Sequence, residues 1–264
     1  GINYVREDFG WDERVDAERL AAVIKAHPEV TILSIVHNET TSGLINDLES
    51  VSKVVKENNL RFIVDAMSSF GAVDVDVGAL GIDFLISSAN KCIQGVPGFS
   101  FIVARTGALR ATEGNARTIS LDLHSQYKTM EADNGKWRFT SPTHVVAAFA
   151  QALKELQVEG GVVVRGARYA AVNRKLRDGM RALGFEPFVC EAFQGPIITT
   201  FLYPEGKSLD FKHMHAWLKD HGYVIYPGKL TDRDTFRIGN IGEIYDEDAD
   251  KILSLFAAYT KEYM

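Results

Sequence analysis

Residues 84–91, Phe84-Leu85-Ile86-Ser87-Ser88-Ala89-Asn90-Lys91, place a single lysine just after a short apolar strand. The stretch Arg61-Phe62-Ile63-Val64 has the same character and ends in Asp65. The lysine and the aspartate are therefore 26 positions apart (91 − 65), each at the carboxyl end of a strand that we expect to be buried. Nearly continuous apolar strands of this kind are typical of a parallel sheet that helices cover on both faces.

Helical patterns alternate with these strands through the first 110 residues. Residues 16–25 and 47–58 have helical spacing, and further strands are expected at 31–37 and 99–104. The predicted fold class is α/β, with a three-layer, mostly parallel sheet in a major domain over residues 1–150. Residues 151–264 are expected to hold a long connecting helix and a small C-terminal α+β domain. The helical pattern runs over 143–183 and breaks near Gly160-Gly161, whereas residues 111–142 show no periodicity.

Composition and charge narrow the classes of function. The chain has 264 residues with 46% hydrophobic content, which is enough for one large and one small domain. A net charge of −6 without a long basic stretch argues against nucleic acid and membranes as partners. No apolar run approaches the roughly 18 residues of a membrane helix, and no signal peptide is visible. Cys92 and Cys190 do not make a disulfide framework, so a cytoplasmic location is expected.

The beginning of the chain suggests that it starts inside a domain. Residue 1 is Gly1, and Ile2-Asn3-Tyr4-Val5 already has the pattern of a strand. We therefore expect that a natural N-terminal segment precedes residue 1 and is absent from this sequence.

Lys91, Asp65 and His37 are expected at one edge of the sheet, because ligands bind outside the carboxyl ends of parallel strands. An amine and a carboxylate at that edge suit pyridoxal phosphate. The lysine would form a Schiff base, and the carboxylate would keep the ring nitrogen protonated so that the ring accepts electrons. Each residue also has an ordinary explanation, since lysines after strands are usually solvated and aspartates often form turns or caps. The residues alone leave both explanations open.

Other residues leave similar alternatives. Arg237 lies among apolar residues, so it needs either an internal carboxylate or an acidic substrate as its partner. The turn His37-Asn38-Glu39-Thr40-Thr41-Ser42-Gly43 either holds a ligand oxygen or simply reverses the chain. Cys92 favours packing over nucleophilic catalysis because no base lies nearby in the sequence. The histidines do not cluster at metal-ligand spacing, and no metal site is expected.

Six stretches, taken in their order and spacing, resemble the fold-type-I pyridoxal phosphate enzymes of the class V aminotransferase group. They are residues 37–43, 64–71, 87–92, 138–144, 226–229 and 236–240. The similarity covers essentially the whole chain. It implies a pyridoxal 5′-phosphate cofactor, a small-molecule amino donor, a 2-oxo acid acceptor, and a homodimer with shared active sites.

The resemblance also implies a role for each matching residue. Lys91 matches the lysine that forms the Schiff base and then carries a proton, and Asp65 matches the partner of the pyridinium nitrogen. Arg237 matches the arginine that holds the substrate's acidic group, in particular the carboxylate of pyruvate or alanine. The remaining positions match cofactor-binding residues: Thr40, Met67, Ser68, Ser88, Asn90, Thr140 and, less closely, Trp137. Thr140 belongs to a loop that such enzymes lend to the neighbouring subunit.

The reaction that the resemblance implies is transfer of the amino group of 2-aminoethylphosphonate to pyruvate, a step of phosphonate catabolism that gives phosphonoacetaldehyde and alanine. Two alternatives remain at this point. The shared motifs also fit alanine–glyoxylate or serine–pyruvate transamination. The chain could also be a catalytically silent fragment, because the family's N-terminal Gly-rich phosphate loop does not precede His37.

Overall fold

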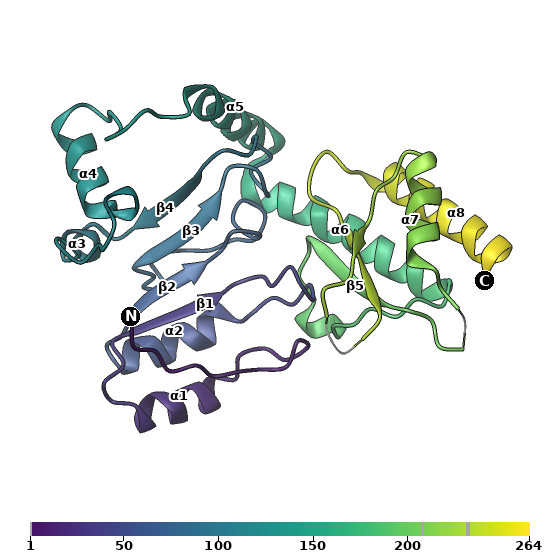
Figure 1. Ribbon diagram of the computed structural model, residues 1–264, viewed down its shortest axis with the longest axis horizontal. Helices are drawn as coiled ribbons and strands as arrows, with labels where there is room; N and C mark the ends of the chain where they lie inside the picture. The colour runs from purple at the N-terminus through teal and green to yellow at the C-terminus, as the bar shows by residue number, and fades with distance from the viewer. Residues whose placement is uncertain (1, 207, 231–232) are drawn as a thin grey trace.

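The computed structural model describes residues 2–206, 208–230 and 233–264. The first half of these residues forms a four-stranded sheet in the order β1-β2-β3-β4. Strands β1 (Ile32–Val36), β2 (Arg61–Asp65) and β3 (Phe84–Ser88) run parallel, and β4 (Ser100–Ala104) runs antiparallel to β3. The sheet is therefore mostly parallel, as the apolar strands predict, and Figure 1 shows it between groups of helices.

Helices α1 (Ala17–Ala26) and α2 (Leu48–Glu57) cover one face of this sheet (Figure 1). Asp16 and Asp47 begin them as N-caps, because their side chains accept hydrogen bonds from backbone N–H groups of the first turn. The apolar sides of both helices pack on alternate residues of the strands. The core that results includes Leu20, Ile24, Ile35, Val51, Val55, Phe62, Val64 and Leu85.

The opposite face is covered less completely than the sequence predicts. The segment 112–123 lines a pocket over part of it; this segment joins helix α3 (Thr106–Arg110) to helix α4 (Leu123–Ala132) and includes a 3-10 turn (Ile119–Leu121). Ile32 and Val36 on the edge strand β1 stay exposed. The expectation that residues 111–142 lack regular structure is wrong, because α4 occupies ten of them.

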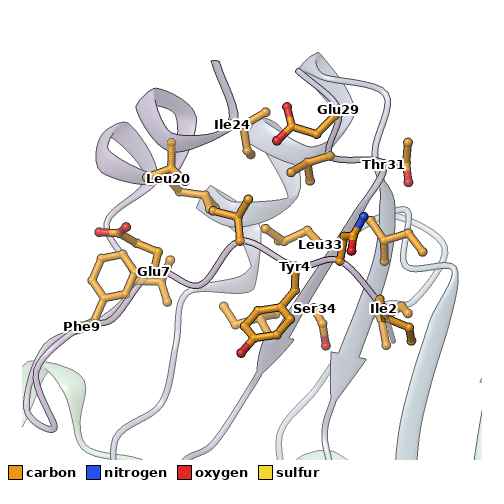
Figure 2. Close-up of a pocket in the computed structure, with 18 residues that line it drawn as sticks. Ile2, Tyr4, Glu7, Phe9, Leu20, Ile24, Glu29, Thr31, Leu33 and Ser34 are labelled. Carbon is orange, nitrogen blue, oxygen red and sulfur yellow. The ribbon is translucent and has the colours of Figure 1, made fainter. Parts of the chain in front are cut away.

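The strand predicted over Ile2–Val5 is also absent from the described residues. Residues 2–10 carry no regular structure and lie beside β1 without pairing with it. Figure 2 shows the pocket between this segment, α1 and β1, where Tyr4, Leu20 and Leu33 are among the lining residues. Gly1, on which the expectation of a missing segment also rested, lies outside the described residues.

Two long helices connect the two halves of the chain. Helix α5 (Thr143–Glu159) packs on the end of the sheet through Phe149, Ala152 and Leu156. The predicted break follows at Gly160 and Gly161, whose φ angles of 112° and 81° are left-handed and favour glycine. Helix α6 (Gly161–Ala182) then runs from the sheet to the second half of the protein (Figure 1).

The second half has its own sheet and its own core. Strands β5 (Ile198–Leu202), β7 (Thr235–Gly239) and β6 (Tyr226–Pro227) form an antiparallel sheet in that order, within the described residues. A 3-10 turn (Glu191–Phe193) precedes β5, and helices α7 (Phe211–Asp220) and α8 (Asp246–Tyr263) pack on this sheet. Buried aromatic rings fill the space between them, among them Phe185, Phe201, Phe236 and Phe256.

Candidate active site

Three turns meet at the carboxyl-end edge of the parallel strands. The backbone N–H of His37, after β1, donates to the carbonyl oxygen of Asp65 at 2.8 Å. The thiol of Cys92, after β3, donates to the carbonyl oxygen of Ser68 at 3.1 Å. The structure therefore joins the turn after β2 to its two neighbours, and it brings the segments that carry Asp65 and Lys91 together.

Asp65 is the last residue of β2, and its side chain is half-buried. One carboxylate oxygen accepts the backbone N–H of Met67 at 2.9 Å, so the turn that follows the strand orients the carboxylate. Met67 is half-buried and Ser68 is buried beside it. This is a fixed negative charge at the sheet edge, as a partner for a protonated ring nitrogen requires.

Lys91 lies in a tight turn and is half-buried. Its carbonyl oxygen accepts the N–H of Gln94 at 2.8 Å, and the N–H of Gly95 returns to the carbonyl of Ala89 at 2.8 Å. Gln94 takes a φ of 63°, in the left-handed region that few non-glycine residues adopt. The turn is therefore strained at one residue, and it needs support from outside itself.

The residues at this edge fit a phosphate-bearing cofactor. The hydroxyl oxygen of Ser88, at the end of β3, is buried and has no hydrogen-bond partner among the described residues. A buried hydroxyl without a partner is costly, and an acceptor such as a phosphate oxygen would satisfy it. Asn90, one residue before Lys91, is exposed and open to a ligand.

His37 is buried at the same edge, and its Nδ1 lies 2.9 Å from the hydroxyl of Ser69. Burial lowers the pKa of His37 from 6.5 to about 4, because the charged imidazolium would lose its hydration. The imidazole is consequently neutral at physiological pH.

Arg237 reaches this edge from the second half of the protein. It lies on β7, opposite Thr200 of β5, and its guanidinium donates to the carbonyl oxygens of Thr40 at 2.9 Å and Pro227 at 3.1 Å. Burial lowers its pKa. Within the described residues no carboxylate lies at ion-pair distance from it. Of the two partners that the sequence left open, the described residues do not supply the internal carboxylate.

Thr140 and Cys92 have different surroundings. Thr140 is exposed in the connection between α4 and α5, where the ring of Trp137 packs edge-on against Phe99 at 6.0 Å. No hydrogen bond among the described residues links Thr140 to the turn of Lys91. Cys92 is fully buried, and burial raises the pKa of its thiol to about 12. That thiol packs and donates to a carbonyl, in agreement with the sequence interpretation.

The sequence interpretation missed the residues of α6 that hold the Lys91 turn. Arg165 donates to the carbonyl oxygens of Cys92 and Ile93, and the hydroxyl of Tyr169 accepts from the side chain of Gln94. The only local signal was an arginine and a tyrosine four residues apart on one helix face. Among the residues that the structure covers, no cluster of histidine, cysteine or acidic side chains could hold a metal, and no helix could cross a membrane.

Comparison with known proteins places the chain in a family. Residues 9–218 match the aminotransferase class-V family. A 2-aminoethylphosphonate–pyruvate transaminase of Syntrophobacter fumaroxidans is 52% identical over 253 residues, which are 96% of this chain and 68% of that protein. A protein of the same name from Klebsiella pneumoniae is 51% identical over 257 residues, 97% of this chain and 70% of the relative. The chain thus spans about two thirds of the length of these curated relatives.

Solved structures agree on the fold. The crystal structure of an alanine–glyoxylate aminotransferase from Nostoc sp. superposes with a TM-score of 0.84, at 23% identity, over 94% of this chain and 66% of that one. At this identity the likeness concerns the fold alone, and it confirms the predicted α/β class. Together with the matches in sequence, it confirms the resemblance on which the sequence interpretation relied. The chain belongs to the class V aminotransferase family, and within it to the group whose curated members are named 2-aminoethylphosphonate–pyruvate transaminases.

Proposed function

We propose that the protein transfers the amino group of 2-aminoethylphosphonate to pyruvate, giving phosphonoacetaldehyde and alanine, with pyridoxal 5′-phosphate as cofactor. The observation that carries this proposal is the identity of 51–52% to transaminases of that name over nearly the whole chain. For the alternative of alanine–glyoxylate transamination, the Nostoc sp. structure offers a likeness of fold at 23% identity, which does not bear on the substrate.

Different residues at the sheet edge would bind different parts of the cofactor. When bound, pyridoxal phosphate supplies an aldehyde carbon for amines and a ring that accepts electrons. The carboxylate of Asp65 would keep the ring nitrogen protonated. The Nζ of Lys91 would hold the aldehyde end of the cofactor and would move a proton to and from the substrate carbon. We assign Thr40, Met67, Ser68, Ser88, Asn90 and Thr140 to cofactor binding, with the buried hydroxyl of Ser88 directed to phosphate.

Arg237 would bind the acidic group of the substrate. A guanidinium has five N–H donors, and two of those on Arg237 are used by the carbonyls of Thr40 and Pro227. The remaining donors can form parallel hydrogen bonds to a carboxylate. Burial makes this interaction stronger than it would be at the surface, because the local dielectric constant is low.

The test is an assay for alanine formed from 2-aminoethylphosphonate and pyruvate by the protein loaded with pyridoxal phosphate. We expect turnover, absorbance of the lysine-bound cofactor, and loss of both in Lys91→Ala. Arg237→Lys should raise the KM for pyruvate more than it lowers kcat, since a lysine cannot reproduce the planar fork. Faster turnover with alanine or serine than with the phosphonate donor would favour the alternative substrates. Absence of both cofactor binding and turnover would identify a silent fragment.

We also propose a homodimer with shared active sites. The segment between α3 and α5 exposes large apolar side chains: Ile119 at 72%, Leu121 at 79% and Phe139 at 57%. Exposed apolar residues gathered in one segment favour a protein partner, and Thr140 directly follows Phe139. Light scattering would give the mass of the assembly. If sites are shared, mixing Lys91→Ala with Thr140→Ala should restore part of the activity, because one mixed site then has both residues.

Two broader assignments complete the proposal. We propose a boundary near residue 150 between a major domain over 1–150 and a smaller one over 151–264, which the two separate hydrophobic cores support. Limited proteolysis would test it. We further propose a cytoplasmic location, since Cys92 and Cys190 are both free thiols. Cell fractionation would test that assignment.

A further inference from the structure

One face of α6 carries four buried polar side chains at four-residue spacing: Arg165, Tyr169, Asn173 and Arg177. Residues four apart lie above one another on a helix, so these side chains form a single stripe. A buried helix face is normally apolar. A polar stripe in this position must therefore satisfy groups on the segments that pack against it.

Arg165 on α6 binds the turn that carries Lys91. Its Nη1 donates to the carbonyl oxygens of Cys92 at 2.9 Å and Ile93 at 3.2 Å, the two residues that directly follow the lysine. Its Nε and Nη2 both lie 2.7 Å from one carboxylate oxygen of Glu159, which compensates the charge. Only 1% of Arg165 is exposed, so these contacts are made away from water and hold the guanidinium in one place.

Tyr169 binds the same turn one helical turn further on. Its hydroxyl oxygen accepts from Nε2 of Gln94 at 2.5 Å and from the backbone N–H of Gly242 at 3.0 Å. Gln94 is the residue with the left-handed φ of 63°. Gln94, the strained residue of the lysine turn, is therefore held by the fully buried phenol of Tyr169. The same phenol also binds the backbone of Gly242 in the second half of the protein.

The same part of α6 contacts the segments of the other two site residues. A Cβ added to Gly166 would lie 2.1 Å from the carbonyl oxygen of Ala72, so the helix backbone touches the turn that follows Asp65. The side-chain amide of Asn240 donates to the carbonyl oxygen of Tyr169 at 3.0 Å. Asn240 comes three residues after Arg237 in the chain, just past the end of β7. One helical segment thus contacts all three parts of the candidate site.

We propose that Arg165 and Tyr169 are positioning residues, which fix the Nζ of Lys91 relative to Asp65 and Arg237 through the turn 91–94. The role of Lys91 in this inference rests on the proposed function. Neither residue forms a hydrogen bond with Lys91, Asp65 or Arg237; each acts through the backbone or the side chain of the turn. Displacement of a reacting group by about 1 Å can reduce a rate by about 10²-fold, so such support affects the chemistry directly.

The first test needs no cofactor. Hydrogen exchange in the apoprotein measures how readily the amides of Gln94 and Gly95, which close the lysine turn, open to solvent. We expect Arg165→Lys to speed their exchange by about tenfold or more, since a point donor cannot hold two carbonyls and Glu159 together. The matched control is Arg177→Lys. Arg177 lies on the same stripe, is 6% exposed and binds Glu191, yet contacts no residue of the turn. Equal exchange in the two variants would overturn the proposal.

The second test uses the cofactor-loaded protein. The absorbance of the lysine-bound cofactor is titrated with pH in wild type, Arg165→Lys, Tyr169→Phe and Arg177→Lys. We expect the first two variants to shift the midpoint and to lower kcat by about 10- to 100-fold with a far smaller change in the KM for pyruvate. Arg177→Lys should titrate as wild type. Unshifted midpoints and kcat in the first two variants would overturn the proposal.

The two tests separate this inference from the function on which it rests. If wild type binds no cofactor, the proposed function fails, whereas the exchange comparison still measures whether α6 holds the turn. If Arg165→Lys does not fold, Tyr169→Phe replaces it in both experiments, because it removes one oxygen atom and leaves the ring packing in place. Unchanged exchange at Gln94 in Tyr169→Phe would then refute the positioning role.

Discussion

Replacement of Gly166 by alanine should displace α6 from the turn after Asp65. The added Cβ would lie 2.1 Å from the carbonyl oxygen of Ala72, which is 1.3 Å inside an ordinary contact of 3.4 Å (3.4 − 2.1). Overpacking costs about 1–3 kcal/mol, and the upper end applies because a backbone carbonyl cannot rotate away. Alanine recovers about 1 kcal/mol of helix propensity. The free energy of unfolding should fall by about 2 kcal/mol, and the thermal midpoint by about 4–8 °C.

Gly179→Ala on the same helix is the matched control. Its Cβ would meet Cδ1 of Leu253 at 2.5 Å, which is the end of a half-buried side chain that can change rotamer. The gain in helix propensity then offsets much of the energetic cost of this contact, and the free energy of unfolding should change by less than about 1 kcal/mol. Urea and thermal unfolding of both variants measure the difference. If Gly166→Ala were as stable as wild type, or as Gly179→Ala, the close approach of α6 to Ala72 would be refuted.

Three further predictions concern single residues. The contribution of His37 to the free energy of unfolding should be fully present above pH 6.5 and should fall by about 3 kcal/mol as the pH drops to 4. The cause is that His37 binds a proton in the unfolded chain over this range, whereas in the folded protein its pKa is about 4. Urea unfolding should show a flatter pH dependence in His37→Gln, and an equal slope would contradict this cause. A thiol reagent at pH 8 should modify exposed Cys190 and should leave buried Cys92 unmodified until the protein unfolds. Rapid modification of both thiols in the native protein would contradict the burial of Cys92. Asp47→Ala should cost about 1 kcal/mol in urea unfolding through loss of the N-cap of α2, and an unchanged midpoint would count against that cap.

The parts of the fold that the sequence predicts are those that local chemistry determines. Asp16 and Asp47 cap helices because their carboxylates accept the N–H groups of the first turn, within three residues. Gly160 and Gly161 end one helix and begin the next because left-handed φ angles favour glycine. The strands β1 to β3 are largely apolar, so their parallel arrangement also follows from composition, although β1 at the edge stays mostly exposed.

The expectations that fail depend on partners that a local pattern does not contain. Helix α4 has no buried residue, and its apolar positions at helical spacing are few: Leu123, Tyr127 and Met130. Its N-cap, Asp122, accepts from the N–H of Ser125 and was a second signal in the sequence. Residues 2–5 have the composition of a strand, but β-propensity mainly reflects packing against neighbouring strands, and in the described structure these residues pair with none.

The polar stripe of α6 shows why the candidate site was only partly predictable. Helical spacing places Arg165 and Tyr169 on one face, yet a sequence rule assigns arginines to the solvent side. Both are buried because they bind groups that lie more than 70 residues away in the chain, the carbonyl of Cys92 and the N–H of Gly242 among them. Contacts of that separation are fixed by the whole fold, and no window of sequence contains both partners.

Arg237 is the residue for which the sequence left two chemical alternatives open, an internal carboxylate or an acidic substrate. Arg237 as a whole residue is 7% exposed, and its guanidinium donates hydrogen bonds to the carbonyls of Thr40 and Pro227. Carbonyl oxygens supply dipoles and no net charge, and among the described residues Glu39 acts on Arg237 only from beyond ion-pair distance, so burial of this cation is only partly compensated. An anionic ligand would remove that cost. The cost supports our proposal that Arg237 binds the acidic group of the substrate.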